Sequence, residues 1–254
     1  MEFFVDKESV VRKIWGRSDT VLFVFAGAAA EFSLNKAVDW LYYTGKLPAD
    51  PLKRLFSTVM YARKILFSEK EAAFKAVDQV TSIHQSVEKS RGARIPDWAY
   101  RDVLFMLIHY SKASFELLER KLTDAEKEEV FQVFYQIGMR MGLKDLPKNY
   151  NEWVIMHSEH LQQDLEKTHY TIDLYKQYRK HLGFIRYWLL IEAQKLVVPK
   201  HVNKLLHLGN LSGFTLILIV YKLSRKIKMD GLLKSIVLPA SYKKQIKEID
   251  IVPA

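Results

Sequence analysis

His84 is the residue whose type and position in the sequence could most directly do chemistry. It belongs to a stretch in which residues at helical spacing share one mostly apolar face, namely Ala73, Ala76, Val77, Val80, His84 and Val87. A buried imidazole on such a face needs a partner for each ring nitrogen. The pattern therefore allows two interpretations: a core histidine with both nitrogens satisfied, or an axial ligand of a metal or haem iron in a pocket walled by the apolar face.

Arg54 and Thr58 form a second candidate pair. They stand four residues apart, so a helix would place them on one face. On a solvated face they would be an ordinary exposed cation beside a hydroxyl. Inside a pocket, the guanidinium would supply a fixed positive charge and the hydroxyl would donate or accept a hydrogen bond.

The other histidines form less complete patterns. His157 and His160 are spaced i, i+3 with Glu159 between them, which permits a shared metal ion, but a third and a fourth ligand are not apparent. We expect this pair on a solvated helix face, with a non-haem metal site as the alternative. His109 follows three apolar residues, 106–108, and is expected in the core.

Composition and missing motifs exclude several kinds of chemistry. The chain contains no cysteine, which excludes disulfides, thiolate metal ligands, a cysteine nucleophile and haem attached through thioethers. It has no glycine-rich phosphate loop, HExxH motif or nucleophile elbow. The net charge is +10, but no basic run is interleaved with stacking aromatic residues, so we expect no nucleic-acid partner.

The elements that must position these residues are helices, and their ends are well marked. Asp50-Pro51 is typical of an N-cap followed by proline at the first helical position. Ser68–Glu71 and Thr123–Glu126 each match a capping box, in which the third helical residue reaches back to the N-cap. Gly92 and Gly142 stand where helices should end.

Apolar spacing predicts helices over residues 7–16, 18–43 with a break, 51–66, 69–90, 98–120, 124–141, 151–167, 171–197, 200–208, 213–226 and 241–248. No linker rich in Ser, Gly or Pro divides the 254 residues, and no hairpin pattern stands out. We therefore predict an all-α protein, a single multi-helix globular domain over residues 1–254 with a globin-like helical core.

Two apolar runs bear on location. Residues 21–32 and 214–221 are both shorter than the roughly 20 residues that a membrane-spanning helix needs, so we interpret both as buried core helices. The N-terminus lacks the long apolar segment of a signal peptide, and we expect a soluble, cytoplasmic protein. As an alternative, residues 214–221 and the basic residues that follow, Lys222, Arg225, Lys226 and Lys228, would make peripheral contact with an anionic membrane.

A set of short segments along the chain matches a known family. They are Asp50–Thr58, Phe67 with Glu71-Ala72, Ile83–Val87, His109, Phe115-Glu116, Ile137–Gly142, Leu146-Pro147 and Val237–Pro239. On these segments, over roughly residues 20–245, the sequence resembles the latex-clearing-protein (rubber oxygenase) and MpaB oxygenase family. The best-studied members of this helical family cleave polyisoprene with a b-type haem.

The resemblance implies a site. It places the proximal haem ligand at His84 and the distal arginine and threonine, spaced R-x-x-x-T, at Arg54 and Thr58. The family commonly has arginines three residues before and four residues after its histidine, and here these positions are Thr81 and Glu88. The implied cofactor is haem b, bound without these flanking arginines.

Two functions are consistent with these patterns. In the first, the chain is a haem-dependent, oxygenase-like oxidoreductase acting on an apolar or lipid-like small molecule, with Arg54 and Thr58 as catalytic residues and His84 on the iron. In the second, it is a non-catalytic helical scaffold that binds a lipid or a protein. The fold alone does not distinguish them.

Overall fold

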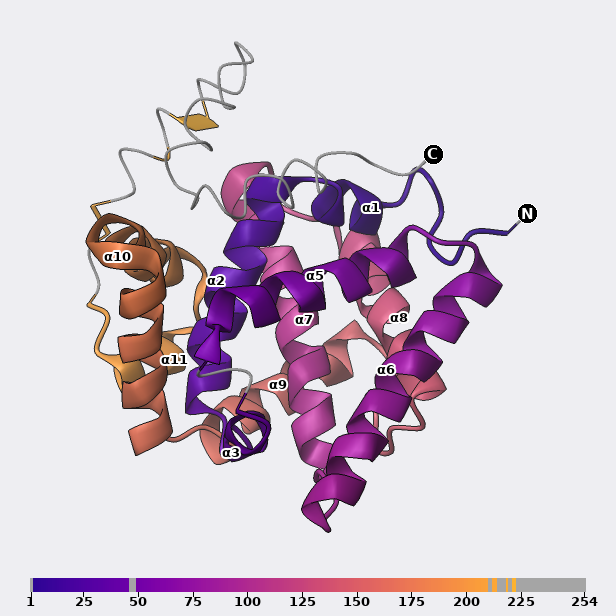
Figure 1. Cartoon of the computed structure of the whole chain (residues 1–254). Helices are drawn as coiled ribbons and strands as arrows, with labels where there is room; N and C mark the ends of the chain where they lie inside the picture. Colours follow the sequence, from indigo (N-terminus) through magenta and orange to yellow (C-terminus); the bar gives the residue numbers. More distant parts are fainter. Residues whose placement is uncertain (1, 46–48, 210–211, 214–217, 219–220, 223–254) are drawn as a thin grey trace.

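The computed structural model describes residues 2–45, 49–209, 212–213, 218 and 221–222. These residues contain ten helices and no sheet (Figure 1). The helices are α1 (Val10–Trp15), α2 (Ser18–Leu34), α3 (Asp39–Tyr43), α5 (Pro51–Leu66), α6 (Lys70–Arg91), α7 (Asp97–Leu118), α8 (Asp124–Arg140), α9 (Tyr150–Gln163), α10 (His169–Val197) and α11 (Lys200–Leu206). They form one helical domain, which confirms the predicted fold class.

The predicted helices correspond to the observed ones, with informative differences at their ends. The break expected within 18–43 follows Leu34, where α2 ends. Helix α9 ends at Gln163, earlier than predicted, because the next residues pair with the end of α2: Glu166 N donates to Leu34 O at 2.7 Å and Lys36 N to Asp164 O at 2.9 Å. The predicted helix 213–226 lies largely outside the described residues, and 241–248 lies wholly outside them.

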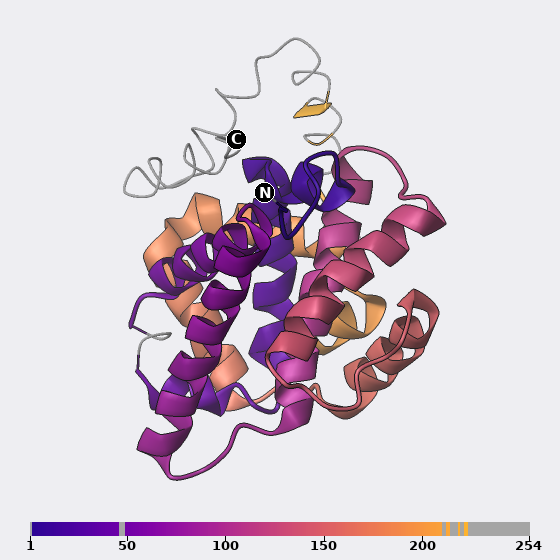
Figure 2. The ribbon, with the colours of Figure 1, turned by 90° about the vertical axis from the view of Figure 1, so that its right-hand side faces the viewer.

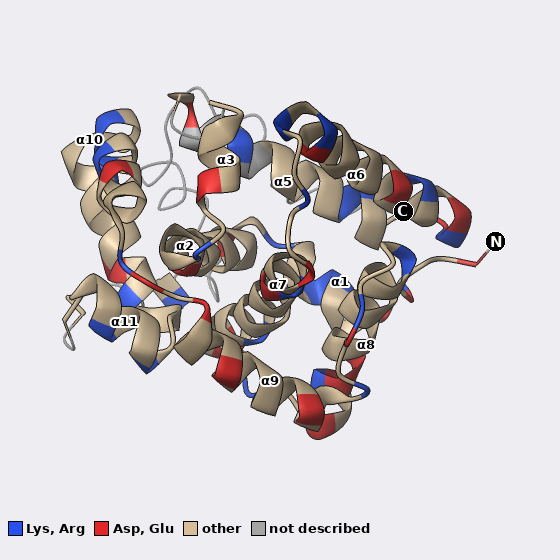
Figure 3. Ribbon diagram, turned by 90° about the horizontal axis from the view of Figure 1, so that it is seen from below, with Lys and Arg blue, Asp and Glu red and all other residues tan. Residues whose placement is uncertain are grey.

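Helices α2 and α7 form the centre of the molecule. Figure 3 shows them side by side in the middle of the view from below, with the other helices around them. Most of α2 is buried, so the apolar run 21–32 is a core helix, as predicted. Gly27 allows this packing, because the Tyr110 ring of α7 occupies the position that a Cβ atom at residue 27 would take.

Helices α5 and α6 pack together at one edge of the molecule, and the end of α6 forms its lower extremity (Figures 1 and 2). The predicted apolar face of α6 is accordingly buried only in its first half. Ala73, Ala76 and Val77 are buried, whereas Val80, His84 and Val87 are half-buried. On α7 the predicted core residues Leu104, Ile108, Phe115 and Leu118 are all buried.

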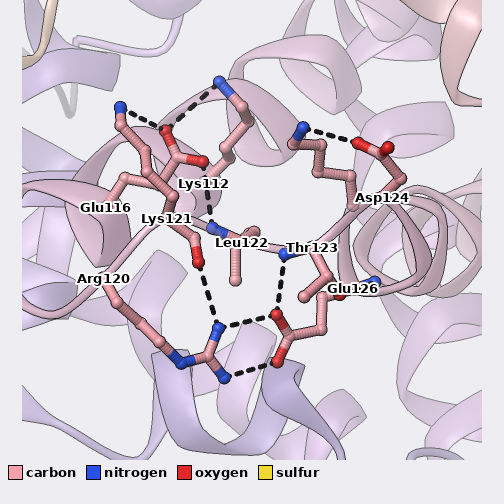
Figure 4. Close-up of polar contacts among 9 residues, drawn as sticks. Lys112, Glu116, Arg120, Lys121, Leu122, Thr123, Asp124 and Glu126 are labelled. Carbon is pink, nitrogen blue, oxygen red and sulfur yellow. Dashed lines mark hydrogen bonds and ion pairs between the residues drawn. The ribbon is translucent and has the colours of Figure 1, made fainter.

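One of the two predicted capping boxes is present. At the start of α8, Glu126 N donates to Thr123 Oγ1 at 3.2 Å, and Thr123 N donates to Glu126 Oε2 at 2.9 Å (Figure 4). The Glu126 carboxylate also accepts two hydrogen bonds from the Arg120 guanidinium, at 2.7 and 2.8 Å. The prediction for residues 68–71 is wrong, because α6 takes Glu69 as its N-cap without a side-chain cap. Here the N-terminal segment supplies the pairing: Phe4 N donates to Ser68 O at 3.1 Å and Lys70 N to Glu2 O at 3.0 Å.

The two predicted glycine stops are confirmed. Gly92 and Gly142 have φ angles of 69° and 77°, in the left-handed region that favours glycine. Beyond them, Ala93 N donates to Glu88 O at 3.2 Å and Leu143 N donates to Gly138 O at 3.0 Å. These bonds satisfy carbonyls that the ends of α6 and α8 would otherwise leave open.

Candidate functional site

Arg54 and Thr58 lie one turn apart on α5, as their spacing predicted. Arg54 is half-buried. Thr58 is exposed, and its hydroxyl donates to the Arg54 carbonyl at 3.0 Å. The pair therefore stands at the border between the α5–α6 contact and solvent, with the threonine hydroxyl bound to its own helix.

His84 lies on α6 and is half-buried. Its ring meets the Tyr100 ring edge-on, with centroids 5.2 Å apart. Its Nδ1 atom is enclosed and has no hydrogen-bond partner in the described part of the chain. Thr81, which could have held this nitrogen, donates its hydroxyl to the Val77 carbonyl at 3.1 Å instead. His84 is thus not the satisfied core histidine that one interpretation expected.

Helices α5 and α6 are in contact, and Arg54 of α5 is near enough to His84 of α6 for its charge to act on the imidazole. Burial lowers the pKa of His84, and the nearby Arg54 charge lowers this pKa further, while Glu88 raises it. Burial also lowers the pKa of Arg54. A neutral imidazole is the form that binds metal, so the electrostatics of this face suit a ligand. Thr58 shares the helix face of Arg54, but its hydroxyl donates to the Arg54 carbonyl of its own helix.

Glu88 stands where the resemblance places an arginine and has a structural role. Its Oε1 accepts hydrogen bonds from Ile95 N at 2.9 Å and from the Tyr100 hydroxyl at 3.1 Å. These bonds join the end of α6 to the start of α7. The carboxylate is therefore engaged in the fold, and neither it nor Thr81 offers a cation to a haem carboxylate. Of the groups expected around a haem, this face supplies the histidine and the Arg54 guanidinium.

A second group of polar residues, of which the sequence singled out only His160, is buried in the centre of the molecule. Glu31 of α2 has 0% of its surface exposed. Its Oε2 accepts a hydrogen bond from the Tyr110 hydroxyl of α7 at 2.7 Å, and its Oε1 lies 3.1 Å from Nε2 of His160 on α9. One buried carboxylate thus joins three helices.

His160 connects this carboxylate to two others. Its Nδ1 lies 2.8 Å from Asp102 Oδ1 and 3.5 Å from Asp164 Oδ2. The other oxygen of Asp102 accepts a hydrogen bond from Asn35 Nδ2 at 2.9 Å. Burial by itself lowers the pKa of His160, but Asp102 and Glu31 outweigh this effect and raise it to about 10. In the absence of a metal ion, the two carboxylates thus favour the protonated form of His160.

The expectation that His157 and His160 lie on a solvated face is wrong, since the two residues are 6% and 4% exposed. His160 lies against Glu31 of α2 and Asp102 of α7, and His157 lies against His109 of α7, which the spacing within α9 could not show. The two rings also have different surroundings, because His160 faces carboxylates whereas His157 faces other rings. His157 stacks on His109 and on Trp153, with centroids 4.9 and 5.0 Å apart, and burial followed by the charge of His109 lowers its pKa to about 3.

The sequence was also compared with models of known protein families. The model of the family described as "ER-bound oxygenase mpaB/B'/Rubber oxygenase, catalytic domain" matches residues 13–216. The chain belongs to this family. No curated protein sequence matches it significantly. The matched range contains both the α5–α6 face and the buried cluster, and it confirms the resemblance found in the sequence.

Membership of an oxygenase family points to oxidoreductase activity and to an apolar substrate. Together with the His/Asp group on α7 and α9, it also points to a metal cofactor. Within the described residues of this chain, no helix has the length and apolar character needed to cross a membrane. The segment 214–228, considered above for peripheral membrane contact, lies largely outside those residues.

The sequence of this chain contains only weak signals for the buried cluster. Glu31 interrupts the apolar run 21–32. Asp164 follows His160 at i, i+4, so the two side chains share a helix face. Asp102 precedes an apolar stretch of its helix. None of these signals indicates that the three residues meet.

Proposed function

We propose that this chain is a haem-dependent, oxygenase-like enzyme acting on an apolar or lipid-like small molecule, with His84 as the axial ligand of haem b. The observation that carries the proposal is the half-buried, under-bonded imidazole of His84 beside the Arg54 guanidinium. Because Nδ1 is enclosed against the protein, Nε2 is the nitrogen available to iron. Family membership supports the choice of reaction class.

The residues of this face have separable roles in the proposal. Haem, when bound, supplies the redox chemistry of oxygen activation. His84 would hold the group on α6, and Arg54 would keep a positive charge beside it in a partly desolvated position, where charge acts more strongly than in water. The Thr58 hydroxyl donates to the Arg54 carbonyl, so its oxygen keeps acceptor capacity toward solvent or substrate.

Haem titration of the purified chain tests the ligand. We expect a sharp Soret shift with the wild type and its loss in His84→Ala. The matched control is His169→Ala, which removes an exposed imidazole at the start of α10 and should leave the shift unchanged. A wild type that binds no haem, or a His84→Ala spectrum equal to that of the wild type, would remove the enzyme proposal and favour the helical scaffold that binds a lipid or a protein.

The role of Arg54 is tested on the haem-loaded protein. Arg54→Ala should lower the affinity for an anionic haem ligand such as azide by several-fold or more, because a nearby fixed cation is lost. Its melting temperature should stay within a few degrees of the wild type, since an exposed or half-buried lone charge contributes under about 1 kcal/mol. Unchanged azide affinity would place the guanidinium outside the site.

For location, we propose a cytoplasmic protein with at most peripheral membrane contact. The apolar runs of the sequence are too short to span a bilayer, and this supports the proposal. Cell fractionation tests it. Recovery only in a detergent-extracted pellet that resists high salt and carbonate would contradict it.

A further inference from the structure

We propose that Asp102, His160 and Asp164 form a binding site for a divalent metal ion, separate from the haem face of α5 and α6. One nitrogen and two carboxylate oxygens from these residues all lie within 4.8 Å of one another. Ligands bound at about 2.0–2.2 Å from a shared ion lie at most about 4.4 Å apart. Small side-chain movements are therefore enough to close the site on an ion.

The orientation of His160 favours this use. Its Nε2 lies 3.1 Å from Glu31 Oε1, where the ring can donate a hydrogen bond to a fully buried carboxylate. In that tautomer Nδ1 carries a lone pair that points at the cluster. Nδ1 is enclosed and makes no hydrogen bond of acceptable geometry in the described structure, although Asp102 Oδ1 is close to it. A carboxylate that fixes the far nitrogen of a histidine is the usual second-shell arrangement of metal sites.

Asp102 is oriented in the same way. It is 2% exposed, and its Oδ2 accepts a hydrogen bond from Asn35 Nδ2, which leaves Oδ1 directed at His160. Asn35 is itself fixed, because its Oδ1 accepts a hydrogen bond from Ala37 N at 2.8 Å. Two of the three proposed ligands are thus held by residues of α2 and the turn after it, while the ligands themselves come from α7 and α9.

Asp164 completes the set at the more open side. Its side chain is 24% exposed and lies one turn after His160, at the end of α9. A hollow of about 70 Å³ borders the three ligands and is also lined by Glu159 and Gln163. A water molecule takes up about 30 Å³, so the hollow has room for one or two water ligands. The site therefore offers three protein ligands and open positions for water.

The charge of the cluster also calls for a cation. Glu31, Asp102 and Asp164 bring three carboxylates to a single imidazole. Arg101 lines the same hollow, but its guanidinium is paired with Asp145 at 3.8 Å. A donor set of one imidazole and two carboxylates suits a divalent first-row ion such as Zn²⁺, Mn²⁺ or Fe²⁺. The competing arrangement is a metal-free imidazolium held between the carboxylates.

Isothermal titration of the EDTA-treated, haem-free full chain with ZnCl₂ decides between these arrangements. We expect one Zn²⁺ per chain, with binding weakened at least tenfold in Asp102→Asn and in Asp164→Asn. Asp164 is partly exposed at a helix end, so its variant should fold, and circular dichroism checks this. A wild type that binds no stoichiometric Zn²⁺, or a folded Asp164→Asn that binds as the wild type does, overturns the proposal.

Two control variants separate this site from its neighbours. His157→Gln should bind Zn²⁺ as the wild type does, because its ring stacks on Trp153 and His109 and is not among the proposed ligands. Loss of binding in this variant would mean that the H-x-x-H pair is the site and would overturn the ligand set. His84→Ala should also bind Zn²⁺ as the wild type does, because His84 is not among the proposed Zn²⁺ ligands. This outcome would show that Zn²⁺ binding does not depend on the proposed haem ligand.

Discussion

The α5–α6 face and the buried cluster of α2, α7 and α9 both contain histidines at helical spacing, but their surroundings are opposite. His84 is half-buried, and its enclosed nitrogen has no partner in the described chain. His160 is 4% exposed and faces two carboxylates within 3.1 Å. The first face is open and under-bonded, as expected of a place that receives a ligand. The second is closed and rich in charge, as expected of a group that holds the helices together or holds an ion.

The difference shows that local sequence spacing sets which helix face a residue is on, whereas the packing of other helices sets whether that face is buried. The apolar face around His84 is regular in sequence, yet it lies at the edge of the molecule and is only half covered. The residues around His160 look polar in sequence, yet His160 is buried against Glu31 of α2 and Asp102 of α7. The cost of removing a side chain should therefore follow the surroundings and not the sequence pattern.

The largest expected effect is at Glu31. Glu31→Ala should lower the free energy of unfolding by about 3–5 kcal/mol, because it leaves the Tyr110 hydroxyl and His160 buried without their shared acceptor. Glu31→Gln keeps an amide oxygen and should cost less. His84→Ala, in the absence of haem, should change stability by less than about 1 kcal/mol. Urea denaturation measures all three, and equal losses for Glu31→Ala and His84→Ala would abolish the contrast.

The close contact of α2 with α7 gives the next effect. Gly27→Ala should destabilise the fold by about 1–3 kcal/mol, because the new Cβ atom meets the Tyr110 ring and must displace it. Since Tyr110 donates to Glu31, tyrosine fluorescence or hydrogen exchange should report the disturbance in the cluster as well. The control on α6 is Ala73→Gly, which changes a buried small residue in the opposite direction. It should lower the free energy of unfolding by about 1 kcal/mol, through helix propensity and lost burial. A Gly27→Ala variant as stable as the wild type would show that Tyr110 moves freely.

The starts of α8 and α6 also differ in their surroundings, because a side chain caps α8 whereas backbone pairing with the N-terminal segment holds the start of α6. Thr123→Ala should lower stability by about 1 kcal/mol, because it removes an observed cap. Ser68→Ala should change stability by less than about 0.5 kcal/mol, since Ser68 makes no side-chain cap in the structure. Thermal unfolding of the two variants side by side measures the difference, and a larger loss for Ser68→Ala would reverse the assignment of the two caps.

The smallest effect is a dependence on pH at Glu126. Hydrogen bonds from Arg120 and then from the Thr123 backbone lower the pKa of Glu126 to about 2, from an ordinary value of 4.5. A lowered folded-state pKa means that the stabilisation is complete above pH 5 and is lost as pH falls toward 2. The stability difference between wild type and Glu126→Gln should be small, because Arg120 is exposed, and it should shrink over that range. A difference that stays constant between pH 5 and 3 would contradict the assignment.

Much of the fold could be predicted from the sequence, and so could the order of residues along each helix. Pro51, Thr123, Gly92 and Gly142 mark helix ends through local chemistry that needs no distant contact. The spacing of Arg54 and Thr58 on one helix is equally local. Ser68 shows the limit, because its helix start is instead paired with residues 2–4.

The sequence by itself determined that the chain is helical, where most helices begin and end, and which histidine stands on an apolar face, because these depend on residues within a few positions of one another. Only the tertiary structure decided that His160 is buried and that it meets Glu31 and Asp102, which are 129 and 58 residues away along the chain. Packing of α2, α7 and α9 brings these charges together, and local spacing carries no information on that packing.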